Sequence, residues 1–512
     1  MKLQVAMMFQ EHMVLQQNHV IPVWGRSVSN DEVTVCLNTQ KVSTKTKNGE
    51  WYLELEPMSS ILSTKMTIYS KKTNETIYIN DVAIGEVIFT GGQSNMEFLM
   101  KYDYNFEEVK NYSKDNLLRY FCYPQTAYVG FNEKEPNPDW GYWRTFEDNE
   151  DKEMFNAVGA YVGLRLREQL NVPIGIISCN WGGTPAPAWA SMNELENNPK
   201  LRKVLDWNND AIKNTKWEGY IKTAFEQKPE PSEQEKEFLD KFMMGVDLSN
   251  FMSISPPPMD PNVYNSYLPG PLSCIRPAGL YENMVSRIAP YPISSFIWWQ
   301  GEDDDARDWV DFYDESMKCV INSWRKLWKE EIPFFQVELA PFESNGITKA
   351  KKYNELRKKQ HEVSQKLKKV YDICILDAGE KFNIHPRHKK IVGYRLANMI
   401  LKYVYHKKIN ADCPTIFHVL KEKNRIELSF DNSYGSIQVT DKLKKYLIIT
   451  SNDIEIDYDY KIIKDKLILV GNFTNDIVIK YCESNYCEAA IFNAENNPLF
   501  GFTLKEELGE FK

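Results

Sequence analysis

The sequence has no excess of basic residues, no long apolar run and no paired cysteine motif. Lys and Arg number 62 against 71 Asp and Glu, giving a formal net charge of −9. That balance argues against a nucleic-acid partner, because such binding uses a basic stripe. No stretch of about 18 apolar residues is present, so we expect no membrane-spanning helix. The nine Cys contain neither a CxxC pair nor a Cys/His zinc spacing, so we expect no metal site.

The first residues also lack the features of a secretory signal. The apolar run at Met7, Met8 and Phe9 is too short for the hydrophobic core of a signal, and polar residues follow it without a proper cleavage site. Together with scattered cysteines in odd number, this absence gives a cytoplasmic location as the expectation.

The patterning divides the chain, which at 512 residues is too long for one hydrophobic core. Residues 1–80 hold short β-rich runs separated by turn signals and predict an N-terminal β-sandwich. Residues 81–408 alternate strand-like and helix-like runs, which is typical of a parallel α/β sheet covered on both faces. Residues 409–512 return to strands and predict a second β domain. The predicted helices are 155–170, 283–288, 312–328, 353–367 and 389–405, and the strands between 81 and 408 are 87–89, 174–178, 295–299, 334–339 and 370–376.

Residues 226–272 interrupt this alternation. They contain Pro229, Pro231, a charged stretch at 232–241 and three consecutive prolines at 256–258. We interpret the segment as an insertion or an active-site loop that does not contribute to the core.

The sharpest chemical signal is the motif GGQSNME at 91–97, directly after the predicted strand at 87–89. Ligands bind at the carboxyl ends of parallel strands, and a serine on a tight glycine turn is exposed there. Ser94 is therefore a candidate nucleophile whose oxyanion could be stabilised at the turn. The motif differs from the GxSxG elbow, because Met96 replaces the second glycine. The structural alternative is a serine that caps a helix.

Three further motifs follow predicted strands: NWGGT at 180–184, WWQGE at 298–302 and NIHP at 383–386. Since the carboxyl ends of parallel strands share one edge of the sheet, one cleft could collect them with Ser94. The two glycines leave backbone N–H groups open to a ligand, and the glutamine adds an amide donor. His385 is the only histidine at a strand-to-helix junction of this domain and is the candidate base.

Taken in order, these motifs resemble those of the sialate O-acetylesterases, carbohydrate esterases of the SGNH hydrolase superfamily. The resemblance runs from FQEHMVLQ at 9–16 to IFNAE at 491–495, through WR at 324–325, LRKKQ at 356–360 and HPxxKxxxGxRLA at 385–397. It implies a three-layer α/β/α hydrolase domain flanked by N- and C-terminal β-sandwich-like domains. It also implies removal of O-acetyl groups from sugars, foremost 9-O-acetylated sialic acid, through an acetyl-enzyme and without a cofactor.

The resemblance further implies a role for each residue of the site. Ser94 is the nucleophile and His385 the base, with Asn383 at a position where relatives commonly have Asp. The oxyanion donors are the N–H groups of Ser94 and Gly183 and the side chain of Gln300. Substrate-binding roles fall to Gln93, Trp299 and Glu302.

The sequence leaves two questions open. Because Asn383 is uncharged, either its carbonyl orients the histidine, which we favour, or a carboxylate does so. The candidate carboxylates are Glu302, Asp377 and Glu380. The substrate could also be an acetylated xylan fragment, and a catalytically inactive sugar-binding protein is a third interpretation that the retained serine and histidine disfavour.

Overall fold

The computed structural model describes residues 2–131, 140–226, 232–245, 262, 264–474, 476–507 and 510–511. The chain has a mixed α/β fold with several sheets and forms two compact units, each built from separate parts of the sequence. The first unit contains Met1–Glu230, Pro256–Trp298 and Glu315–Phe334, and the second contains Pro231–Ser255, Trp299–Asp314 and Phe335–Lys512.

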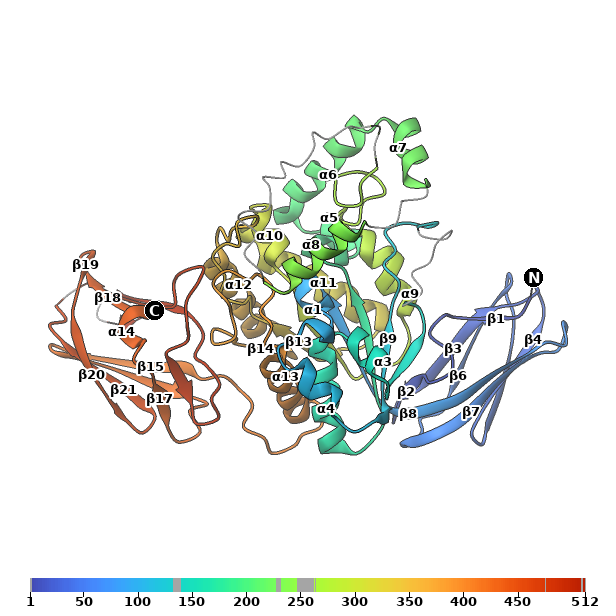
Figure 1. Ribbon diagram of the computed structural model, residues 1–512, viewed down its shortest axis with the longest axis horizontal. Coiled ribbons are helices and arrows are strands. Elements are labelled where there is room, and N and C mark those ends of the chain that lie inside the picture. The colour runs from blue at the N-terminus through green and yellow to red at the C-terminus, as the bar shows by residue number, and fades with distance from the viewer. Residues whose placement is uncertain are drawn as a thin grey trace. The chain divides into compact units, whose positions relative to one another are not determined.

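Strands that are mostly antiparallel form the N-terminal part of the first unit, drawn in blue in Figure 1. One sheet has the order β1 (Gln4–Val5), β3 (Ile21–Arg26), β6 (Glu50–Leu55). The other strands are β2 (Val14–Gln16), β4 (Glu32–Leu37), β5 (Gln40–Lys45) and β7 (Ile61–Ser70). Alternate residues of β4 and β6 are buried, which gives these strands one face toward the core, as the sequence pattern predicts.

Strand β8 (Thr76–Gly92) belongs both to this β-rich part and to the central strands of the unit. Its first half pairs with β7 in the antiparallel sense, and its second half pairs in parallel with β11 (Ile174–Asn180). The sequence pattern predicts only residues 87–89 of this strand. The predicted domain boundary at residue 80 falls within it.

The central strands of the first unit have the order β10 (Trp143–Phe146), β9 (Asp115–Cys122), β11, β8, β12 (Ser295–Trp299). The β9, β11 and β8 strands are parallel, and β10 is antiparallel to β9. The sequence pattern does not predict β9 and β10, whereas β11 and β12 lie where it predicts strands.

Helices pack on both faces of these strands. On one face, α4 (Ala157–Leu170) places Gly163 against Leu118. On the other, α11 (Tyr313–Trp328) packs Trp324 against Phe89, with ring centroids 5.1 Å apart. The shorter helices of the unit are α1 (Ser94–Glu97), α2 (Phe106–Lys110), α3 (Asn149–Met154), α5 (Met192–Glu196), α6 (Arg202–Asn214), α7 (Trp217–Ala224) and α9 (Ser286–Ile288).

The second unit contains the strands β13 (Phe334–Val337) and β14 (Val370–Ile373), which are neighbours in a sheet. Its helices are α8 (Glu233–Met243), α10 (Glu302–Ala306), α12 (Tyr353–Lys366), α13 (Lys389–Tyr403) and α14 (Leu443–Tyr446). The α12 and α13 helices begin at the residues that the sequence predicts. Part of the predicted insertion forms α8, while its residues 227–231, 246–261 and 263 lie outside the described residues.

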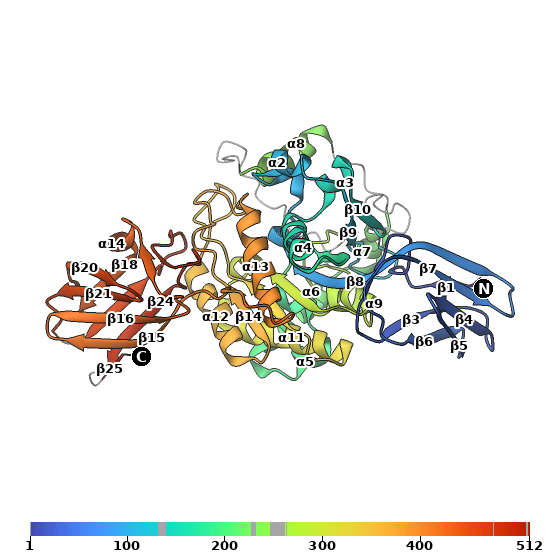
Figure 2. The same cartoon turned by 90° about the horizontal axis from the view of Figure 1, so that it is seen from below.

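The C-terminal part of the second unit consists of strands around one apolar core, drawn in orange and red in Figures 1 and 2. Leu428, Leu469 and Ile479 are among the buried residues of this core. A four-stranded sheet contains β15 (Thr415–Glu422), β16 (Arg425–Asp431), β21 (Lys466–Gly471) and β20 (Tyr458–Ile463). The other strands are β17 (Ile437–Val439), β18 (Leu447–Ser451), β19 (Ile454–Glu455), β22 (Ile477–Tyr481), β23 (Ile491–Asn493), β24 (Phe502–Glu507) and β25 (Glu510–Phe511).

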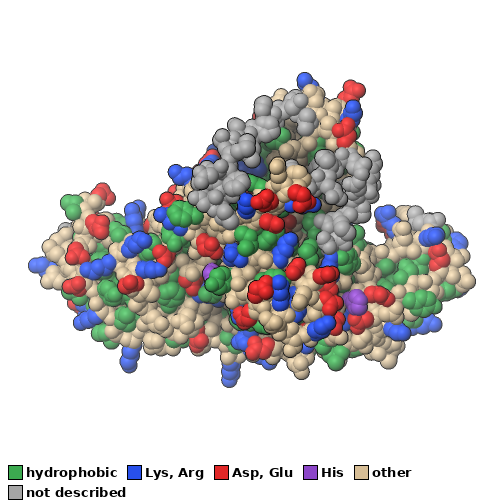
Figure 3. Space-filling model, viewed as in Figure 1, with side chains coloured by type: hydrophobic (Ala, Val, Ile, Leu, Met, Phe, Trp, Pro, Cys, Tyr) green, Lys and Arg blue, Asp and Glu red, His purple; other side chains and the backbone are tan. Residues whose placement is uncertain are grey.

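Acidic and basic side chains alternate over the face of the molecule shown in Figure 3. Within the described ranges, no helix is long and apolar enough to cross a membrane. Nor do the His, Cys, Asp and Glu residues of those ranges form a group of three or more that could hold a metal ion.

Candidate active site

Ser94 is the first residue of α1 and follows β8 closely. The chain turns at Gly92, whose φ of +139° is a conformation that L side chains rarely adopt. Ser94 is half-buried, whereas Asn95 and Met96 behind it are buried. The serine therefore lies on a glycine turn at the carboxyl end of a parallel strand, where the sequence predicts it.

The two glycines of the NWGGT motif differ in the partners of their N–H groups. Gly182 packs against the nucleophile turn, since a Cβ placed on it would lie 3.2 Å from the Cβ of Ser94. Its N–H donates to Oε2 of Glu97 at 2.6 Å. Gly183 has a φ of +64°, and within the described part of the chain its N–H donates to no acceptor. Gly183 is therefore the glycine whose N–H remains available to a ligand.

Glu97 is a residue of this site that was not predicted from the sequence. Besides the Gly182 N–H, its carboxyl accepts a hydrogen bond from Nε2 of Gln125 at 3.0 Å. Burial raises the pKa of Glu97, while the two hydrogen bonds act in the opposite direction. Glu97 thus ties the glycine turn after β11 to the helix that starts at the serine. Its sequence signal is its place as the last residue of the GGQSNME motif.

Gln93 is buried at the N-cap of α1. Its backbone carbonyl accepts the N–H groups of Met96 and Glu97, each at 2.9 Å. These bonds close the turn that carries the serine, and the predicted role of the Gln93 side chain in substrate binding stays a prediction.

Gln300 follows β12 in the second unit and is fully buried. Its Nε2 donates to the carboxylate of Asp304, and the Tyr313 hydroxyl lies 3.2 Å from its Oε1. The same hydroxyl lies 3.0 Å from the Gln300 backbone carbonyl, which also accepts Nε2 of Gln360 at 3.0 Å. Partners at both ends fix the orientation of the side-chain amide.

The residues around Gln300 are closely packed. A Cβ on Gly301, whose φ is +149°, would come within 2.8 Å of the Leu356 side chain, so this position requires glycine. Trp299 is buried, with the ammonium of Lys389 4.2 Å from its ring centroid. Glu302 is buried at the start of α10. The substrate-binding roles predicted for Trp299 and Glu302 stay predictions.

His385 is 2% exposed, and its ring packs edge to face with Phe242 of α8, with 5.1 Å between centroids. Burial, together with the charge of Lys389, lowers the pKa of His385 to about 3. The imidazole is therefore neutral at neutral pH, which is the form that accepts a proton. Phe242 shows that the described part of the predicted insertion reaches the candidate base.

Asn383 connects the backbone of His385 to a carboxylate. Its Oδ1 accepts the backbone N–H of His385 at 2.9 Å, and its Nδ2 donates to Glu380 at 3.1 Å. Asp377 instead forms a two-pronged ion pair with Arg395, with both distances 2.7 Å. Of the three candidate carboxylates, Glu380 is the one that accepts a hydrogen bond from Asn383.

The predicted residues fall into two sets, one in each unit. The first unit contains Gln93, Ser94 and Gly183. The second contains Trp299, Gln300, Glu302, Asn383 and His385.

Residues 269–402 match the family described as carbohydrate esterase, sialic acid-specific acetylesterase. This segment includes Gln300 and His385, and Ser94 lies outside it. The sialate O-acetylesterase of Rattus norvegicus is 23% identical over 85% of this chain and 79% of its own length. That of Homo sapiens is 22% identical over 86% of this chain and 78% of its own.

A solved structure, that of a carbohydrate acetylesterase from Xanthomonas citri, has the same fold. It matches 98% of this chain and 99% of its own, with a TM-score of 0.74 and 21% sequence identity. The matches place this chain among the carboxylic ester hydrolases that deacetylate carbohydrates. Within that class it is similar to the sialate O-acetylesterases, as the order of its motifs predicts.

Proposed function

We propose that this protein removes O-acetyl groups from sialic acid, foremost at the 9-hydroxyl, with Ser94 as nucleophile and His385 as base. The observation that carries the proposal is the packing of Gly182 against Ser94, with the neighbouring Gly183 N–H left available. A serine beside an available backbone donor is the arrangement that acyl transfer requires.

In the first half of the reaction, the Ser94 hydroxyl attacks the acetyl carbonyl and His385 takes its proton. The neutral state of the buried imidazole suits this role. The tetrahedral intermediate then collapses, the sugar oxygen leaves with the proton from His385, and the acetyl group remains on Ser94.

The negative oxygen of the intermediate needs donors. We propose the N–H groups of Ser94 and Gly183 and the Nε2 of Gln300. The Gly182 N–H is excluded from this role because Glu97 accepts it. The Gln300 amide is held in one orientation by its partners, so it would need no rearrangement during the reaction.

In the second half, a water molecule attacks the acetyl-enzyme while His385 takes a proton from it. Collapse of the second intermediate returns that proton to Ser94 and releases acetate. Throughout, Asn383 holds the backbone of His385 in place and is itself held by Glu380. We propose these two residues as the group that positions the base.

We also propose that the central strands and the helices on them form an SGNH-type three-layer domain. An SGNH-type three-layer domain has helices on both faces of a parallel sheet, with the serine at a strand end. The packing of α4 and α11 on opposite faces of the central strands of the first unit supports it.

The test is acetate release by the Ser94→Ala protein and, as a control, by Ser59→Ala, which changes an exposed serine of the N-terminal part. The substrates are 9-O-acetyl sialic acid, an acetylated xylo-oligosaccharide and a chromogenic acetate ester. We expect Ser94→Ala to remain folded and to lose about 10³-fold or more in rate, and Ser59→Ala to behave as the wild type.

Near-normal turnover by Ser94→Ala would refute the serine mechanism. If the wild type preferred the xylo-oligosaccharide, the substrate would be an acetylated xylan fragment and not sialic acid. No release from any of the three would instead favour a sugar-binding protein without catalysis.

A further inference from the structure

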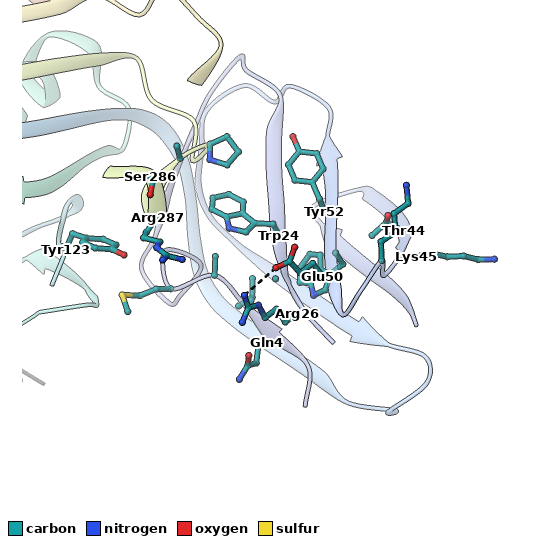
Figure 4. Close-up of a pocket in the computed structure, with 18 residues that line it drawn as sticks. Gln4, Trp24, Arg26, Thr44, Lys45, Glu50, Tyr52, Tyr123, Ser286 and Arg287 are labelled. Atoms are coloured by element: carbon teal, nitrogen blue, oxygen red, sulfur yellow. Dashed lines mark hydrogen bonds and ion pairs between the residues drawn. The ribbon is translucent and has the colours of Figure 1, made fainter. Parts of the chain in front are cut away.

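A cavity of about 900 Å³ lies in the first unit, and none of the residues assigned to the reaction lines it. Most of its lining comes from strands β1, β3, β5 and β6 of the N-terminal part and from Ser286, Arg287, Ala289 and Pro290 at and after α9. The volume is within the range of small-molecule sites. Figure 4 shows this cavity with its side chains.

Two aromatic rings form one wall. Trp24 of β3 and Tyr52 of β6 are directly opposite each other in an antiparallel pair, so their side chains share a face of the sheet. Tyr52 is 47% exposed. Phe9 packs edge to face against Trp24 with 5.0 Å between centroids, which holds the indole in place. In Figure 4 the two rings lie beside each other. They form a flat apolar surface on which a ligand ring could stack.

The charged side chains that line the cavity are mostly basic. One anion, Glu50, lines the cavity and pairs with Arg26 at 3.4 Å. Lys45, Lys47 and Arg287 also line it and have no ion-pair partner in the described parts of the chain. The chain as a whole carries a formal charge of −9. The cavity lining is therefore more positive than the chain as a whole. It favours a ligand with a negative group.

We propose that this cavity is a second carbohydrate site, which binds an acidic sugar without hydrolysing it. The sugar ring stacks on Trp24 and Tyr52 through its C–H groups, and its carboxylate is bound by Arg287, whose planar guanidinium matches a carboxylate with two parallel hydrogen bonds. The site goes beyond the proposed esterase activity, because it concerns the capture of an acidic glycan and not the cleavage of an ester.

The test is calorimetric titration of the protein with sialyllactose, which has a sugar carboxylate but no O-acetyl ester. Lactose serves as the neutral comparison. The variants are Tyr52→Ala and Arg287→Gln. Their matched controls are Tyr78→Ala, a tyrosine 70% exposed outside the cavity, and Arg202→Gln, whose side chain is 73% exposed on α6.

We expect both cavity variants to bind sialyllactose about tenfold more weakly or worse, and both controls to bind like the wild type. Lactose should bind far more weakly than sialyllactose, and higher salt should weaken sialyllactose binding. Hydrolysis of the chromogenic acetate should be the same in all five proteins.

Equal affinity of the wild type and the two cavity variants for sialyllactose would overturn the proposal, as would equal affinity of the wild type for lactose. Because sialyllactose contains no ester to cleave, these results do not depend on catalysis. A wild-type protein that binds the sugar in the cavity but hydrolyses no acetate would refute the esterase mechanism alone.

Discussion

Among single residues, His385 has the environment with the clearest consequence for activity. Burial and Lys389 both disfavour the imidazolium and lower the pKa of His385 to about 3, against an ordinary value of 6.5. The base therefore stays neutral well below pH 6.5. We expect kcat/KM for a chromogenic acetate to stay level as the pH falls from 7 through 6.5, and to decline only at lower pH.

Replacing Lys389 should move that decline. Lys389→Met removes a positive charge that opposes the imidazolium, so the pKa of His385 should rise and the acid limb should shift to higher pH. Methionine keeps an apolar side chain against the ring of Trp299. Lys407→Met, on an exposed position after α13, is the control for the lost charge. Identical acid limbs in the two variants would contradict the role of Lys389.

Gln300 allows a test of the oxyanion assignment. Gln300→Ala should lower kcat about 10²-fold with little change in KM, because the donor acts mainly on the transition state. Tyr313→Phe removes one partner of the amide and should cost less, with the same pattern. Steady-state kinetics on 9-O-acetyl sialic acid separates the two constants. A rise in KM at constant kcat would instead make Gln300 a group that positions the substrate.

The candidate residues could be predicted because each follows a strand and carries reactive chemistry. Their neighbours could not be predicted in the same way. Glu97 binds Gly182, which lies 85 positions away, and Phe242 reaches His385 from the insertion. Such contacts depend on how distant segments pack, and no local pattern specifies them. Lys389 belongs to the HPxxK motif, yet the motif does not reveal that its ammonium lies over Trp299.

At the level of elements, the sequence predicts best where periodicity is regular. The α12 and α13 helices begin where predicted, and β12 has the predicted bounds. β9 was missed because a charged residue, Arg119, lies in its middle and is buried there. Arg119 pairs with Asp81 at 3.0 Å, a partner that is absent from the local pattern.

The segment after α8 supplies a prediction for an element. Gly245 has a φ of +70°, and a Cβ on it would lie 2.3 Å from Nδ2 of Asn383. Gly245→Ala should therefore displace Asn383, loosen the backbone of His385 and lower kcat about tenfold or more.

The matched control is Gly435→Ala. Gly435 also has a positive φ, +101°, but a Cβ there would meet nothing within 4 Å. Both variants carry the strain of a left-handed alanine, about 1 kcal/mol, and only the first carries the clash. Full activity of Gly245→Ala would show that α8 and the following turn do not support the base.

For the molecule as a whole, the predicted C-terminal domain at 409–512 can be tested as a fragment. Its buried core residues lie within 413–500, apart from Cys374 and Leu376, which lie outside the fragment. We expect the fragment to fold and to unfold cooperatively on heating, followed by circular dichroism.

The fragment should nevertheless melt below the corresponding transition of the full chain. Arg357, which it lacks, donates to the backbone carbonyls of Ser484 at 2.6 Å and Asn485 at 3.1 Å. A longer fragment, 353–512, restores these bonds and the two core residues and should melt at a higher temperature. A fragment 409–512 without a β-sheet spectrum would refute an independent C-terminal domain.

The continuity of β8 bears on how such a protein can evolve. One strand of 17 residues begins beside β7 in the N-terminal part and ends at the turn that carries Ser94. A recombination event at residue 80 would cut this strand and separate the serine from the pairing that sets its register. We therefore expect the N-terminal part to be exchanged between lineages only together with the strand that leads to the nucleophile. We expect the N-terminal part and the segment that carries Ser94 to be inherited together. Substitutions in one should therefore be accompanied by substitutions in the other.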